Sequence, residues 1–248
     1  MTERETLRDA AGRAVATFTA STRDGLPAAD ELTAAPGIAP DAVADLVMRR
    51  LPGHIVETTA PLGELLLGAG ATLRRRSTLM TCDTAVPRAP VPVPAGILIG
   101  PAQGVPPDAL LDAYIEAFPP EHPDHHAGVD RDGQRELLRS MMDGEVIGPL
   151  LPCARTAAVG GRLVGAALVV DMPGAPPLGG PWVGELFRHP DAPPGTGAAM
   201  LAAALDRAAA DGLPRVGLRV STDNPARRIY DARGFTETRS SVSVVLPG

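Results

Sequence analysis

The spacing of apolar residues predicts a mixed α/β domain in the second part of the chain. Apolar residues recur at helical spacing in four segments, 107–118, 130–142, 195–210 and 225–233. Alternating or short continuous apolar runs predict strands at 95–99, 154–159, 162–170, 181–188, 215–221 and 235–246. The order β-α-α-β-β-β-α-β-α-β predicts a mixed central sheet flanked by helices, an α/β fold of the layered α+β kind.

Two proline-rich stretches divide the chain. Residues 86–94 (VPRAPVPVP) alternate proline with other residues, which prevents a helix and favours an extended linker. We therefore expect a smaller first domain over residues 1–85 and a second domain over residues 95–248. Residues 171–181 are rich in proline and glycine and predict a loop between two strands.

Composition excludes several classes of function. The net charge is −6 and all 23 basic residues are arginine, so nucleic acid is not an expected partner. The first five residues are polar, unlike a signal peptide, and no apolar run reaches transmembrane length. Cys82 and Cys153 form neither a zinc pattern nor a disulfide framework. We expect a cytoplasmic protein without a membrane partner.

The segment HPDAPPGTGAAML joins the strand at 181–188 to the helix at 195–210. Gly195 and Gly197 permit a tight turn and leave room for a ligand. The helix behind them begins with free N–H groups and a partial positive charge, which suits a pyrophosphate. By itself, this pattern equally fits a turn that starts an ordinary alanine-rich helix.

The next strand and helix, VGLRVSTDNPARRIYDARGF, complete a more specific pattern. Together with VGELFRHPDAPPGTGAAML, it resembles the GNAT acetyltransferase superfamily from residue 95 to the C-terminus. The residues that carry the second motif are Asn224, Ala226, Tyr230, Gly234 and Phe235. The first motif departs from the family, because Ala192 stands where Arg or Gln is usual, and Pro193 and Pro194 follow it.

The resemblance implies a site for acetyl-CoA as acyl donor. The family's strand before the glycine loop faces the pantetheine and thioester, and Leu186, Phe187 and Arg188 match it. Since the two prolines donate no N–H, the pyrophosphate depends on Gly195, Thr196, Gly197 and Ala198, with the Thr196 hydroxyl as a further donor. Asn224 either contacts the cofactor or caps the helix that follows.

The resemblance also implies a reaction, transfer of acetyl from acetyl-CoA to a primary amine by direct attack. Tyr230 matches the family's proton donor to the leaving thiolate, and its alternative is a core aromatic. Glu185 can accept the proton of the amine, or it is a strand carboxylate without a role. The competing hypothesis for the whole domain is a non-catalytic acyl-CoA-binding or regulatory module.

Acidic and histidine residues gather in the loop FPPEHPDHH, residues 118–126. Three interpretations are open: a metal site, a rim that attracts a cationic amine, and a solvated loop. We expect no metal. For the acceptor rim, the candidates are Glu116, Glu121 and Asp124, with Asp112 as an addition. The acceptor is a small-molecule amine or a protein or peptide amine, and the chain is a monomer or a homodimer.

The first part of the chain matches the end of the second part at a shift of 164 positions. Val56 then meets Val220, Thr58 meets Thr222 and Ser77 meets Ser241, among others. Leu66 stands where the second part has Tyr230. We therefore expect residues 1–83 to be a degenerate, partial GNAT-like half without a catalytic site, which packs on the second domain.

Overall fold

The structure is a computed structural model that describes residues 4–23, 25–174 and 178–248. It divides into two compact units. The first contains the residues up to Leu79 together with Arg239–Gly248, and the second is Met80–Thr238. These units differ from the expected domains in two respects. Residues 80–94 fall in the second unit, and the last ten residues fall in the first, because two long strands, β5 and β11, each have residues in both.

The first unit is a sheet with two helices. Its elements are β1 (Arg4–Arg8), β2 (Ala14–Arg23), β3 (Leu26–Ala34), α1 (Pro40–Arg50), β4 (Ile55–Thr59), α2 (Ala60–Gly68) and parts of β5 (Thr72–Asp83) and β11 (Thr236–Val245). The strand order is β1-β2-β3-β4-β11-β5. Its core packs the apolar faces of α1 and α2 on the sheet, with Val43, Val47, Leu66 and Val244 fully buried.

The first unit repeats the element order of the later part of the chain, as the sequence shift predicts. The series β2-β3-α1-β4-α2-β5 corresponds to a later series of two strands, helix, strand, helix and strand that ends in β11. The C-terminal strand pairs with β4 in antiparallel register, Ser241 opposite Thr59. The last strand of the second series therefore completes the sheet of the first unit.

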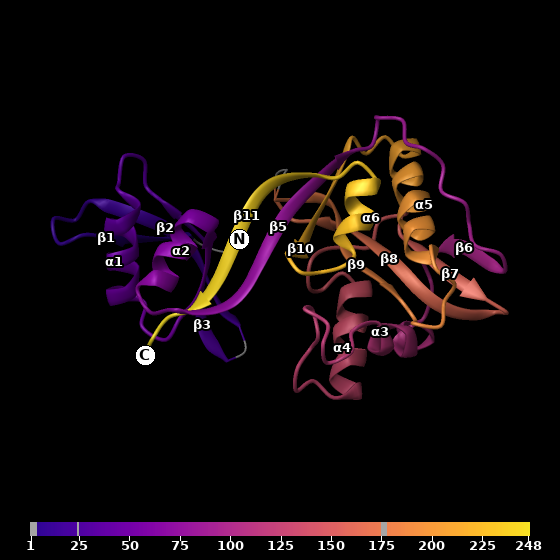
Figure 1. The fold of residues 1–248 in the computed structure, drawn as a ribbon, viewed down its shortest axis with the longest axis horizontal. Helices are drawn as coiled ribbons and strands as arrows, with labels where there is room; N and C mark the ends of the chain where they lie inside the picture. Colours follow the sequence, from indigo (N-terminus) through magenta and orange to yellow (C-terminus); the bar gives the residue numbers. More distant parts are fainter. Residues whose placement is uncertain (1–3, 24, 175–177) are drawn as a thin grey trace. The chain divides into compact units, whose positions relative to one another are not determined.

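The second unit is a sheet with helices on both faces. Its elements are β6 (Ile97–Pro101), a 3₁₀ turn (Pro107–Ala109), α3 (Leu111–Ala117), α4 (Arg131–Met142), β7 (Arg155–Val159), β8 (Arg162–Met172), β9 (Gly180–Arg188), α5 (Thr196–Ala210), β10 (Arg215–Ser221) and α6 (Arg227–Ala232). The helices α5 and α6 lie on one side of the strands and α3 and α4 on the other (Figure 1). None of the described helices is long and apolar enough to cross a membrane.

Element types follow the sequence predictions, and several bounds differ. The helix predicted at 107–118 is a 3₁₀ turn followed by a shorter α-helix. The helix predicted at 225–233 begins only at Arg227, after a turn at Pro225. The first strand is shifted by two residues, to Ile97–Pro101. The predicted loop at 171–181 is shorter than expected, because β8 extends to Met172 and β9 begins at Gly180, and residues 175–177 of this loop lie outside the described residues.

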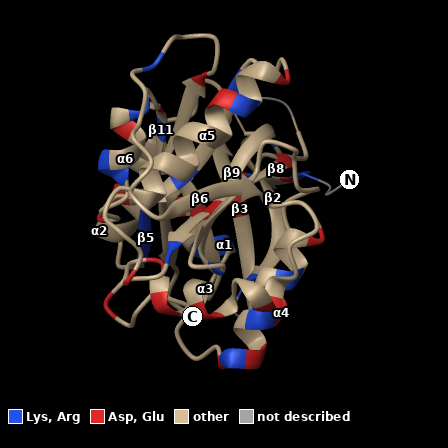
Figure 2. Cartoon of the chain, turned by 90° about the vertical axis from the view of Figure 1, so that its right-hand side faces the viewer, with Lys and Arg blue, Asp and Glu red and all other residues tan. Residues whose placement is uncertain are grey.

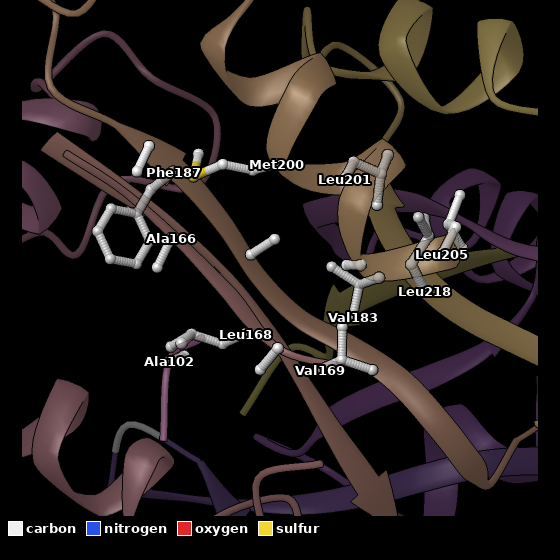
Figure 3. Packing of buried hydrophobic residues seen from close by; sticks show 14 of the residues in the cluster. Ala102, Ala166, Leu168, Val169, Val183, Phe187, Met200, Leu201, Leu205 and Leu218 are labelled. Atoms are coloured by element: carbon white, nitrogen blue, oxygen red, sulfur yellow. The ribbon is translucent and has the colours of Figure 1, made fainter. Parts of the chain in front are cut away.

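The core of the second unit forms around α5 and the strands beneath it. Met200, Leu201 and Leu205 of α5 are buried, and Leu201 and Leu205 gather beside Val183 and Leu218 of the sheet (Figure 3). Burying side chains of this size stabilises the fold by about 1.5–3 kcal/mol each. The packing fixes the start of α5 against the end of β9.

The sheet opens between β9 and β10. Strand β9 pairs with β8 along its whole length, from Gly180 to Arg188. It pairs with its other neighbour, the parallel strand β10, only at Trp182 and Val183. The end of β9 is therefore hydrogen-bonded to a strand on one side and faces an opening on the other.

Candidate functional site

A cavity of about 400 Å³ lies at the open edge of β9, entirely within the second unit. Four segments line it: the end of α3 with the following loop, the end of β9, the first turn of α5, and the start of α6. The wall is mostly apolar, because Phe118, Leu186, Phe187 and Ile229 contribute to it. Leu186, Phe187 and Arg188, which the sequence places at the acyl donor, all line the cavity.

The glycine loop supplies free backbone donors beside this cavity. Gly195 has a φ of +91°, which only glycine adopts without strain, and precedes the first residue of α5. Among the described residues, the N–H groups of Gly195, Gly197 and Ala198 have no hydrogen-bond partner. Gly197 lines the cavity, and a side-chain carbon there would be 3.7 Å from Ile229 Cδ1. This end of α5 therefore fits an anionic group such as a pyrophosphate.

Thr196 has a different role from the one predicted. Its N–H and its hydroxyl both donate to the carbonyl of Pro193, at 3.2 and 2.7 Å. The side chain is fully buried. Thr196 therefore closes the turn that starts α5, and both of its donors are already engaged.

Asn224 stabilises the turn into α6 and also lines the cavity, and its predicted contact with the cofactor stays a prediction. Its side-chain oxygen accepts from the N–H of Ala226 at 2.7 Å, which holds this turn. Its amide nitrogen donates to Asp124 at 2.6 Å, and the Ser221 hydroxyl donates to the same carboxylate at 2.6 Å. Asp124 thus fastens the loop at 118–126 to the end of β10.

The acidic residues proposed for the acceptor rim separate into different places. Glu116 lines the cavity, whereas Glu121 is exposed and is not among the residues that line it. Asp112 forms an ion pair with Arg131 at 2.6 Å on the outer surface. Similar pairs cover α4, whose basic and acidic side chains alternate along the helix (Figure 2). Of these carboxylates, only Glu116 faces the cavity.

The three histidines of the same loop each have a hydrogen bond. His122 lines the cavity, and its Nδ1 accepts from the N–H of Asp124, so the neutral ring carries its proton on Nε2. His125 Nδ1 is 2.7 Å from the Phe118 carbonyl, and His126 Nε2 is 3.0 Å from the Tyr114 hydroxyl. No group of three or more metal-ligating side chains occurs in the part of the chain that the structure describes.

Tyr230 lies in the core of the second unit. It is 7% exposed, packs edge-on against Phe235, and is not among the residues that line the cavity, although the adjacent Ile229 is. Burial raises the pKa of its hydroxyl, and the carboxylates of Glu185 and Asp124 raise it further. The hydroxyl is therefore protonated at neutral pH and donates hydrogen bonds. The structure thus places Tyr230 in the core, and its predicted part in proton transfer stays a prediction.

Glu185 lies on β9 opposite Leu168 and is half-buried. Its negative charge raises the pKa of two buried tyrosines, Tyr114 and Tyr230, after the larger effect of burial. Glu185 is not among the residues that line the cavity. The charge of the predicted base therefore acts on the hydroxyl of Tyr230, and its part in proton transfer stays a prediction.

Residues 86–94 are docked on the second unit. Arg88 donates to the carbonyls of Asp83 and Thr84, and Arg233 donates to the carbonyl of Ala89 at 2.9 Å. At the end of the segment, the ring of Pro94 lies 3.6 Å from where a side chain on Gly195 would begin. The expected linker therefore borders the glycine loop.

Sequence analysis missed several residues of the cavity, above all Phe118, His122 and Ile229 as wall residues. Phe118 and His122 belong to a loop that the sequence identified only by its charges. Ile229 directly precedes Tyr230 in the second motif, and its position next to the tyrosine was the available signal. The ring of Tyr114 contacts two of the wall residues, Phe118 and Phe187, edge-on.

Comparison with solved structures identifies the fold. A GCN5-related N-acetyltransferase from Sphaerobacter thermophilus superposes with a TM-score of 0.67 at 18% identity, over 100% of this chain and 82% of that one. The chain has the GNAT fold. Two further structures agree. One is a tandem GNAT protein from the clavulanic acid biosynthesis pathway, with a TM-score of 0.59 at 18% identity, over 97% of this chain and 81% of that one. The other is a GCN5-related N-acetyltransferase from Kribbella flavida, with a TM-score of 0.57 at 17% identity, over 94% of this chain and 87% of that one. No protein-family model and no curated protein sequence matches the chain.

The likeness to GNAT structures includes both units. The superpositions extend over almost the whole chain, so the first unit is part of the shared architecture. The prediction of a GNAT-like second domain preceded by a partial GNAT-like half is confirmed at the level of the fold.

Proposed function

We propose that this protein is an acyl-CoA-dependent N-acyltransferase that transfers acetyl from acetyl-CoA to a primary amine. The observation that carries the proposal is the opening between β9 and β10, which adjoins the free N–H groups at the start of α5. An elongated ligand with an anionic middle fits an apolar cleft that ends at a helix N-terminus. Among solved structures, the fold of this chain occurs in N-acetyltransferases.

The residues present fit acetyl-CoA. Leu186 and Phe187 give the cavity an apolar wall beside unpaired strand backbone, and Gly197 leaves room for a phosphate to approach the helix. When bound, acetyl-CoA supplies a thioester whose acetyl group can pass to an amine. Unpaired backbone N–H groups at the end of β9 are suited to hold a carbonyl oxygen, and each such donor contributes about 3 kcal/mol in enzymes of acyl transfer.

Two side chains are proposed to assist the transfer. Tyr230 is protonated at neutral pH and donates toward the leaving thiolate. Its raised pKa makes it a weaker acid than a free tyrosine, so we assign it a hydrogen bond that strengthens as charge develops on sulfur. Glu185 is the proposed acceptor for the proton of the amine, through water. Glu116 is the proposed attractive charge for a cationic acceptor, because it lines the cavity.

A thermal-shift titration tests the donor. Acetyl-CoA and CoA at 100 times their Kd add about 2.7 kcal/mol to the free energy of unfolding. We expect a saturable rise in melting temperature with both, and none with ATP. Release of free thiol from acetyl-CoA across a panel of primary amines then tests the reaction. A protein that binds neither CoA ligand at millimolar concentration does not have the proposed function.

The second candidate is a non-catalytic acyl-CoA-binding module. It is favoured by one observation, that neither Tyr230 nor Glu185 is among the residues lining the cavity. In that case the melting temperature rises with acetyl-CoA, whereas no amine in the panel accelerates thiol release. The two measurements together separate the candidates.

A further inference from the structure

Arg188 is the one arginine among the described residues that line the cavity. It is the last residue of β9 and stands at the start of the loop that leads to α5. The loop itself provides no arginine or lysine side chain, because position 192 holds a buried alanine and Pro193 and Pro194 follow it. The positive charge available to an anion at the helix N-terminus thus comes from the strand.

The guanidinium of Arg188 also fixes the shape of this loop. Its Nη1 donates to the carbonyls of His189, Pro190 and Ala192, at 3.2, 3.0 and 3.1 Å. These carbonyls come from successive parts of the same turn, so the side chain lies on the inner side of the loop. A guanidinium has five N–H donors. Nε and Nη2 have no hydrogen-bond partner among the residues that the structure describes.

We propose that Arg188 binds the pyrophosphate of the acyl donor through Nε and Nη2, while Nη1 holds the loop closed. The proposal rests on the proposed function, since the pyrophosphate is that of CoA. It assigns the ligand two kinds of donor: the N–H groups of Gly197 and its neighbours on α5, and a guanidinium on β9. The planar fork of arginine matches two phosphate oxygens, which a lysine ammonium cannot do.

Two variants separate charge from loop support. Arg188→Gln removes the charge but keeps an amide that can donate to the loop carbonyls, and Arg188→Lys keeps the charge without the fork. The matched control is Arg207→Gln on α5, where Arg207 pairs with Asp211 at 2.7 Å and does not line this cavity. Calorimetry measures the Kd of acetyl-CoA and of S-acetylpantetheine, which lacks the pyrophosphate, at several NaCl concentrations.

We expect Arg188→Gln to weaken acetyl-CoA binding by about tenfold to a hundredfold at low salt, the effect of losing hydrogen bonds between charged groups. The dependence of Kd on salt becomes flatter, because one ion pair is lost. Arg188→Lys loses less affinity and keeps the salt dependence. S-acetylpantetheine binds equally well to all four proteins, and Arg207→Gln behaves as wild type.

Three outcomes overturn this inference alone. One is wild-type affinity and salt dependence in Arg188→Gln. Another is an equal loss in the Lys and Gln variants with the salt dependence unchanged, which assigns Arg188 only to the loop. The last is a wild-type protein that binds S-acetylpantetheine as tightly as acetyl-CoA, which leaves the proposed function standing. A wild type that binds neither ligand overturns both proposals.

Discussion

The hydroxyl groups of Ser77 and Ser241 lie 3.0 Å apart, buried within the first unit. Ser77 is on β5 and Ser241 on β11, and they are the same position in the two copies that the sequence shift of 164 aligns. The contact shows that the last strand of the second copy is built into the sheet of the first unit. The C-terminal residues therefore matter for a unit that is remote in sequence.

This contact predicts a non-additive pair of substitutions. Ser77→Ala leaves the Ser241 hydroxyl buried without its partner, and we expect it to lower the free energy of unfolding by about 1–3 kcal/mol. Removing both hydroxyls costs less than the sum of the single changes, because no buried donor is then left unsatisfied. Urea unfolding of the four proteins in the cycle measures the coupling. Strict additivity contradicts the contact.

The role of Tyr230 is testable against the other tyrosine of the chain. Tyr230→Phe should lower turnover by about 10²–10⁴-fold if the hydroxyl acts on the leaving thiolate, with acetyl-CoA affinity nearly unchanged. Tyr114→Phe is the matched control, because Tyr114 is also buried and near Glu185, and its hydroxyl bonds to His126. It should cost about 1 kcal/mol of stability and leave turnover alone. Unchanged turnover in Tyr230→Phe removes this residue from the reaction.

A substitution at Gly197 tests whether acetyl-CoA approaches the start of α5 closely. An alanine there makes an ordinary contact with Ile229, and its helix propensity adds up to about 1 kcal/mol to the stability of the free protein. The same methyl group projects into the cavity, so acetyl-CoA binding should weaken by about tenfold or more. Gly68→Ala, at the end of α2 in open space, is the control for propensity. Equal acetyl-CoA affinity in both variants places the ligand elsewhere.

Burial raises the pKa of both tyrosines, so stability should depend on alkaline pH. The folded state keeps the phenols protonated, whereas the unfolded chain releases their protons above about pH 10. The stability that this provides is complete below pH 10 and is lost as pH rises beyond it. The chain has no lysine that titrates in the same range. The free energy of unfolding should be measured as a function of pH. Above about pH 10 it should fall less in the double variant Tyr114→Phe/Tyr230→Phe than in wild type. An equal fall in both proteins would contradict the burial of these hydroxyls.

The sequence predicted the elements of the second unit well because their signals are local. The strand at 215–221 has the predicted bounds, and α4 and α5 each begin one residue after the predicted start. Helical and alternating periodicity depend on which face of an element is buried, and both are visible within a few residues. The break of the helix predicted at 107–118 was less visible, since Pro107 begins the segment and apolar residues at helical spacing follow it without a further breaker.

The sequence by itself determined that the chain ends in a GNAT-like series and that a glycine turn starts its long helix. The first rests on the resemblance of two motifs to the family and the second on the identity of Gly195, and each motif consists of residues close together in sequence. Only the tertiary structure decided which side chains meet: Arg188 with the loop carbonyls, Asp124 with Asn224, and Ser77 with Ser241. It also decided that Tyr230 is buried and that the hydroxyl and N–H of Thr196 both donate to the carbonyl of Pro193. Such contacts depend on how distant strands are paired and packed, and no local pattern of residues encodes that geometry.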